Sequence, residues 1–142
     1  MSKEGIEDTI HTKSFCGSYA YLAPEMVKKV GHGKAVDWYL LGVMIYEMLT
    51  GIPPYYDNDR EVLFFNIVNQ DLEMPWNVTK ECKDLLKKLL HKNPSKRLGA
   101  VKGASEIKNH PWFRSVNWKD VFDWKVEPPF PYLKRKVKKG DG

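Results

Sequence analysis

One segment, AVDWYLLGVMIYEMLT at positions 35–50, constrains the fold more than any other part of the sequence. Gly51 follows it, and Pro53 and Pro54 come next, which is the pattern that ends a helix. Its large apolar residues lie on every side of the helix: Val36, Trp38, Leu40, Leu41, Val43, Met44, Ile45, Met48 and Leu49. A helix that is apolar all round belongs in the middle of a larger core.

Further helices are predicted at about 59–69, 79–91 and 104–109. The candidate buried residues of the first are Val62, Leu63, Phe65 and Ile67. The second has Thr79 as N-cap and an amphipathic stripe formed by Cys82, Leu85, Leu86, Leu89 and Leu90. Residues 1–34 are expected to be mostly loop, and three prolines after position 127 favour an extended arm. The predicted fold is therefore mainly α, without a convincing strand.

Composition excludes several classes of protein. With 142 residues the chain has room for one domain. No apolar run reaches the roughly 18 residues of a membrane span, and the polar N-terminus is no signal peptide. Cys16 and Cys82 have no metal-ligand spacing, which is typical of a reduced, intracellular protein. We expect a cytoplasmic protein without stable membrane insertion and without a metal site of its own.

The net charge of +5 is concentrated at the C-terminus. Residues 134–142, KRKVKKGDG, carry five basic residues and one acidic residue, and the remaining chain has a net charge of +1. Such a tail is most often a solvated end, and contact with nucleic acid or anionic lipid is the alternative. Because no aromatic residue interrupts the tail, we expect no nucleic-acid partner.

Several motifs occur in the order found in one enzyme family. SFCGS at 14–18 and YLAPE at 21–25 come first, followed by AVDW at 35–38 with Gly42, NPSKRLG at 93–99, HPWF at 110–113 and VEPPF at 126–130. Lys3-Glu4-Gly5-Ile6 adds a match near the N-terminus. Together they resemble the second half of the catalytic domain of AGC-type serine/threonine protein kinases, of the protein kinase B and cyclic-AMP-dependent kinase kind.

The resemblance implies a fold, a domain division and an activity. Residues 1–113 would be the helical C-lobe of a kinase, with 1–34 as activation segment and 35–113 as helical subdomain. Residues 114–142 would be part of the C-terminal tail, and the N-lobe is absent. The complete enzyme would transfer the γ-phosphate of ATP, with Mg²⁺, to serine or threonine of protein substrates.

Regulation is implied for the activation segment. Ser14 matches the family's activating phosphosite, so an upstream activating kinase is an expected partner, and Lys3 matches a lysine that contacts the phosphate. Thr9 and Thr12 are weaker phosphosite candidates. A plain loop serine remains the alternative for Ser14.

Other matched residues would support the catalytic machinery without being catalytic. Glu25 and Arg97 match a buried ion pair that ties the activation segment to the helical lobe, the alternative being two surface charges. Asp37 and Ser18 match residues that support the catalytic loop, and Trp38 is expected in the core.

A substrate-binding group is implied as well. Glu47 would contact basic residues of the substrate, with a structural partner as the alternative, while Phe15, Tyr19 and Leu22 would line the pocket for the residue after the phosphoacceptor. The chain departs from many relatives at Ser18-Tyr19-Ala20-Tyr21, where they have Thr-Pro-Glu-Tyr. Since Ala20 lacks the carboxylate, a preference for basic substrates does not follow.

Phosphoryl transfer needs elements that these 142 residues do not contain. There is no G-x-G-x-x-G, no H-R-D and no D-F-G in the sequence. We therefore expect the chain to bind no ATP or Mg²⁺, to be inactive alone, and to need an N-terminal half of the kinase. Two alternatives stay open, a non-catalytic kinase-like binding module and an unrelated helical adaptor with a basic tail.

Overall fold

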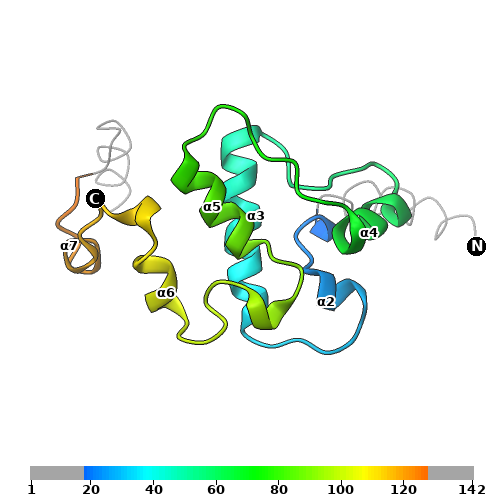
Figure 1. Cartoon of the computed structure of the whole chain (residues 1–142), viewed down its shortest axis with the longest axis horizontal. Coiled ribbons are helices and arrows are strands. Elements are labelled where there is room, and N and C mark those ends of the chain that lie inside the picture. The colour runs from blue at the N-terminus through cyan, green and yellow to red at the C-terminus, as the bar shows by residue number, and fades with distance from the viewer. Residues whose placement is uncertain (1–17, 128–142) are drawn as a thin grey trace, which may run out of the picture. The chain divides into compact units, whose positions relative to one another are not determined.

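The structure, a computed structural model, describes residues 18–127 and forms two compact units. One extends to Trp112 and the other begins at Phe113. The first holds α2 (Pro24–Val27), α3 (Ala35–Thr50), α4 (Arg60–Asn69), α5 (Lys80–Leu89), the 3-10 helix η1 (Pro94–Lys96) and α6 (Ala104–Lys108), as Figure 1 shows. The described residues are helical without a strand, which confirms the mainly α prediction.

The central helix α3 spans the predicted range 35–50. It ends because Gly51 takes a left-handed conformation, with φ of 87°, and its backbone N–H bonds to the Glu47 carbonyl. One face of α3 packs on α5 (Figure 1). Gly42 lies at this contact, where a Cβ atom would stand only 2.9 Å from Leu89 Cβ. The absence of a side chain at Gly42 therefore lets the two helices approach closely.

Helix α5 follows its sequence pattern closely. The Thr79 hydroxyl accepts a hydrogen bond from the Cys82 N–H at 3.1 Å and caps the helix. Every member of the predicted stripe is buried: Cys82, Leu85, Leu86, Leu89 and Leu90. The helical prediction is confirmed, with Leu90 as C-cap rather than His91 as the last residue.

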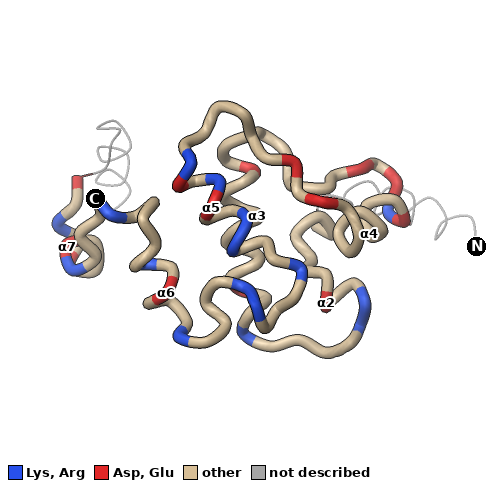
Figure 2. Tube along the Cα trace, in the orientation of Figure 1, with Lys and Arg blue, Asp and Glu red and all other residues tan. Residues whose placement is uncertain are grey.

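Helix α4 begins after Asp59, whose carboxylate accepts from the Glu61 N–H at 2.9 Å. The prediction of its buried face was half wrong. Leu63 and Ile67 are fully buried against Ala20, but Val62 and Phe65 are exposed. Leu63 and Ile67 are four residues apart and share the face that meets α2, and Val62 and Phe65 lie outside it. Figure 2 shows acidic positions gathered around α4 and its neighbouring loops.

Short helices were largely missed by sequence reasoning. Helix α2 lies within the range expected to be loop, and η1 and η2 (Pro111–Phe113) are single turns that begin with proline. The second unit contains α7 (Trp118–Phe122), capped by Asn117. There the Phe113 and Trp118 rings lie 5.2 Å apart. Helix α6 is the exception, because it lies within the predicted range 104–109. The other elements of three to five residues carry too little periodicity to be recognised.

The remaining face of α3 is left uncovered by the described residues. Leu40, Met44 and Met48, spaced four residues apart, are 36%, 50% and 77% exposed. Among the described residues, α3 therefore keeps an exposed apolar stripe. Within the part of the chain described here, no helix combines the length and hydropathy of a membrane span.

Candidate functional site

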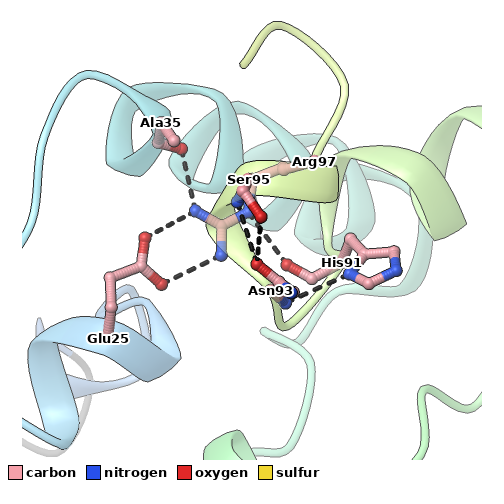
Figure 3. A network of polar contacts seen from close by, with 6 residues as sticks. All are labelled: Glu25, Ala35, His91, Asn93, Ser95 and Arg97. Atoms are coloured by element: carbon pink, nitrogen blue, oxygen red, sulfur yellow. Dashed lines mark hydrogen bonds and ion pairs between the residues drawn. The ribbon is translucent and has the colours of Figure 1, made fainter. Parts of the chain in front are cut away.

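Glu25 on α2 and Arg97 after η1 lie in contact although 72 positions separate them. The guanidinium donates from Nη1 to Glu25 Oε2 at 2.7 Å and from Nη2 to Oε1 at 2.9 Å (Figure 3). Both side chains are buried. This fork geometry is the strong, orientation-specific form of an ion pair, and neither charge lies at the surface.

Arg97 binds three further groups besides the carboxylate. Its Nη1 donates to the Ala35 carbonyl at 3.0 Å, and its Nε donates to the His91 carbonyl at 2.9 Å. The guanidinium carbon also lies 4.9 Å from the centroid of the Tyr39 ring. One side chain therefore joins α2, the start of α3 and the turn after α5.

The turn that carries Arg97 is held by its own polar side chains (Figure 3). Asn93 Oδ1 accepts from the Ser95 N–H at 3.0 Å and from the Ser95 hydroxyl at 2.7 Å. The Asn93 N–H donates to Nδ1 of His91 at 3.1 Å. These bonds hold residues 91 to 95 and so orient the turn that carries Arg97.

Opposing effects act on the pKa of Glu25. Burial favours the neutral acid and would raise the pKa, but hydrogen bonds from Arg97 and the backbone N–H of Glu25, with the charges of Arg97 and His32, outweigh it. The pKa of Glu25 therefore lies below its ordinary value, and the carboxylate is ionised at neutral pH. The site contains a buried, charged pair.

A second contact joins the segment before α2 to the last turn of α3. The Tyr21 hydroxyl lies 2.8 and 2.6 Å from the two carboxylate oxygens of Glu47 and donates to them. This bond, together with burial and the Glu47 charge, raises the pKa of Tyr21. Tyr21 and Glu47 line an open groove of about 360 Å³ with the exposed apolar residues of α3, Leu40, Met44 and Met48.

The remaining predicted residues of the described chain lie around these contacts. Ser18 is exposed and Leu22 is half-buried. The Tyr19 ring packs edge-on against Phe64 at 5.3 Å. Asp37 is exposed in the first turn of α3, and its side chain forms no hydrogen bond with another described residue. Three predicted residues, Ser14, Lys3 and Phe15, lie outside the described range, as do Thr9 and Thr12.

Two polar features were missed by sequence reasoning. His110, buried, lies with Nε2 2.7 Å from Asp84 Oδ2, and its Nδ1 accepts from the Trp112 N–H at 3.1 Å. The Tyr39 hydroxyl is buried without a partner among the described residues. No local pattern marks either, because each depends on packing between distant segments.

Metal binding finds no support in the described residues. Between positions 18 and 127, no group of three or more His, Cys, Asp or Glu side chains is arranged to hold an ion.

Comparisons with known proteins agree with the motifs. The protein kinase domain family matches residues 2–113. Serine/threonine-protein kinase Sgk2 of Homo sapiens is 44% identical over 130 residues, which are 92% of this chain and 35% of that protein. Kinase gad8 of Schizosaccharomyces pombe is 45% identical over 23% of its length, and Sgk1 of Gallus gallus 43% over 30%. The chain thus spans between 23% and 35% of the length of these relatives, and the resemblance to AGC-type kinases is confirmed.

Proposed function

The chain belongs to the protein kinase family, and from this premise we propose that it is the helical C-lobe of a serine/threonine protein kinase. In this proposal the complete protein transfers the γ-phosphate of ATP to serine or threonine of protein substrates. The division at residue 113 and a cytoplasmic location stay predictions.

The observation that carries the proposal is the buried pair of Glu25 and Arg97. It links the end of the proposed activation segment to the helices that support it. A movement that separated the two buried charges would leave each of them unpaired, which is energetically costly. The position of the segment that carries Glu25 therefore depends on this ion pair. Such a link suits a segment that must hold a peptide substrate in one position.

Roles for the other residues follow from their positions. Tyr21 holds the Glu47 carboxylate in the groove, where it would attract a basic side chain of a peptide substrate. Tyr19 and Leu22 would line the pocket for the residue after the phosphoacceptor. Ser18 and Asp37 would support a catalytic loop contributed from outside these residues.

ATP and Mg²⁺ do not fit the residues present. The sequence contains none of the phosphate-binding or metal-binding motifs of kinases, and the described residues hold no metal-binding group. Both cofactors would be bound elsewhere in a complete kinase, so no catalytic step is assigned to residues 1–142. Thermal melting of the isolated chain with ATP and Mg²⁺ should show no shift.

A chimera tests the proposal directly. Residues 1–142 are joined behind the preceding part of the Sgk2 catalytic domain, and phosphate transfer to a protein substrate is measured. We expect activity in the chimera and a large loss with Arg97→Met, with Lys88→Met as the control because Lys88 forms only an exposed pair with Asp84. A folded but inactive chimera would contradict the proposal.

Regulation is tested in the same chimera. If Ser14 is the activating phosphosite, Ser14→Ala should abolish activation by an upstream kinase while Thr12→Ala leaves it intact. Equal activity of both variants and the parent would rule out the role of Ser14.

A non-catalytic binding module is the second candidate. The groove at Tyr21 and Glu47 is formed by this chain alone and needs no ATP to attract a basic peptide. A folded, inactive chimera that still binds an arginine-containing peptide would favour this candidate.

A further inference from the structure

A separate concavity lies between the C-terminal ends of α3 and α4. It has a volume of about 190 Å³, and three tyrosines, Tyr46, Tyr55 and Tyr56, line it together with the acidic residues Asp71 and Glu73. We call it the tyrosine pocket. None of the residues that line the groove at Tyr21 and Glu47 takes part in it.

Hydrogen bonds hold the walls of the tyrosine pocket in place. The Tyr46 hydroxyl donates to the Glu73 carbonyl at 2.8 Å and pins the chain after α4 to α3. The Asn66 side-chain amide donates to the Tyr55 carbonyl at 3.3 Å and fixes the other wall. Tyr55 has a positive φ of 66°, which a non-glycine residue adopts only when its surroundings compensate. The pocket is thus shaped by contacts across three segments.

The charged side chains that line the pocket are acidic. Two carboxylates and no basic residue line it. Burial, and next the charge of Glu73, raise the pKa of Tyr46. Burial, with smaller effects of Tyr46 and Asp71, raises the pKa of Tyr55 to about 12. Burial is the largest cause for both tyrosines, and a neighbouring carboxylate adds to it in each case.

One tyrosine of the pocket already contacts a cation. Lys92 Nζ lies 4.1 Å from the centroid of the Tyr55 ring and donates to the Ile67 carbonyl at 2.7 Å. Tyrosine rings attract cations through the negative charge of their faces. Tyr56, about 40% exposed, and the two carboxylates remain accessible to a ligand from solvent.

We propose that the tyrosine pocket binds an arginine side chain of a protein partner. Ligand sites for nucleotides and drug-sized molecules usually exceed about 300 Å³, so this volume suits one side chain. A planar guanidinium stacks on aromatic rings and pairs with carboxylates at the same time. The acidic surroundings of α4 in Figure 2 would attract such a partner over a longer range.

The test uses the full 142-residue chain with Met44→Gln and Met48→Gln, labelled with ¹⁵N, and two short peptides. These two changes lie outside the tyrosine pocket and remove the exposed apolar side chains of α3 that would otherwise promote association. One peptide has a single arginine between glycines, and the other has citrulline, the neutral isostere of arginine, at that position. The side-chain amides of Asn66 and Gln70, which line the pocket, are the NMR reporters. We expect both to shift saturably with the arginine peptide and not with the citrulline peptide, and the shift to weaken in high salt.

Two double variants complete the design. Asp71→Asn with Glu73→Gln removes both carboxylates but keeps the Glu73 carbonyl bonded to Tyr46, and it should weaken binding by about threefold to tenfold. Glu61→Gln with Asp123→Asn removes the same charge from outside the pocket and should change binding by less than about twofold. Equal weakening in both double variants would mean that binding depends only on the net charge of the chain, and it would overturn the proposal. Equal binding of the citrulline and arginine peptides would also overturn it. Reporter amides without dispersed signals would overturn it as well, because they would mean that the pocket is not formed.

Discussion

Each nitrogen of the Arg97 guanidinium group donates a hydrogen bond inside the protein. Arg97→Met removes all of them and leaves Glu25 buried without its counter-charge. We expect a loss of about 3–5 kcal/mol in the free energy of unfolding. Urea denaturation followed by far-ultraviolet circular dichroism measures it.

The control for Arg97 is an exposed ion pair of the same chain. Lys88 contacts Asp84 at 3.0 Å with both side chains about half exposed, so Lys88→Met should cost less than about 1 kcal/mol. In the double variant Glu25→Met with Arg97→Met no charge is left unpaired, and its cost should be smaller than the sum of the two single changes. An Arg97→Met cost no larger than that of Lys88→Met would contradict this account.

The lowered pKa of Glu25 gives the pair a defined pH dependence. A carboxyl group with a pKa below its ordinary value of 4.5 contributes its full stabilisation above that value. The contribution is lost as pH falls through the lower native pKa. We therefore expect the stability difference between the wild type and the Glu25→Met, Arg97→Met double variant to be constant from neutral pH down to the ordinary value, and to change only below it. Urea midpoints over a pH series test this, and a change that starts near neutral pH would mean a raised pKa.

At the scale of elements, the contact between α3 and α5 depends on one glycine. A Cβ at Gly42 would lie 2.9 Å from both Leu89 Cβ and Leu90 Cδ2. Alanine favours the helix by about 1 kcal/mol over glycine, but Leu89 Cβ is next to the backbone and cannot move without shifting α5. We expect Gly42→Ala to be net destabilising, by about 1–2 kcal/mol.

Gly33 provides the matched control for Gly42. A Cβ at Gly33 meets no atom within 4 Å, so Gly33→Ala should change stability by less than about 0.5 kcal/mol. Urea denaturation of the Gly42→Ala and Gly33→Ala variants measures the change in the free energy of unfolding. A stabilising Gly42→Ala would show that helix propensity outweighs the close packing of α3 and α5.

At the scale of the whole molecule, the uncovered face of α3 determines the behaviour of the isolated chain. Met44 and Met48 lie on it with half or more of their surface exposed. An exposed apolar face promotes association. We expect the isolated chain to be helical but loosely packed or associated, and to bind a hydrophobic dye. Met44→Gln with Met48→Gln should reduce dye binding and association while helix content is retained.

Two exposed apolar residues outside this face serve as the control. Val30 and Val101 are 70% and 82% exposed, and Val30→Gln with Val101→Gln should leave dye binding unchanged. Sedimentation velocity measures association in parallel. A wild-type chain that is a monodisperse monomer with a sharp melting transition would show that the face is covered within the chain.

The sequence by itself determined the long helices and their ends. The range 35–50, the cap at Thr79 and the stripe of α5 follow from contacts between neighbours three or four residues apart, which sequence periodicity records. The motif resemblance also led to the protein kinase family. The helices depend on residues close together in the sequence, and the family is indicated by short motifs.

Only the tertiary structure decided which faces are covered and which charges meet. The burial of Leu63 but not Phe65 depends on where α2 packs, and the contacts of Tyr21 with Glu47 and of Asp84 with His110 join segments 26 residues apart. The resemblance predicted that Glu25 pairs with Arg97. It predicted neither the geometry of the pair nor the hydrogen bonds from Arg97 to the carbonyl groups of Ala35 and His91. Such contacts depend on how helices pack in space, and no periodicity along the chain encodes that packing.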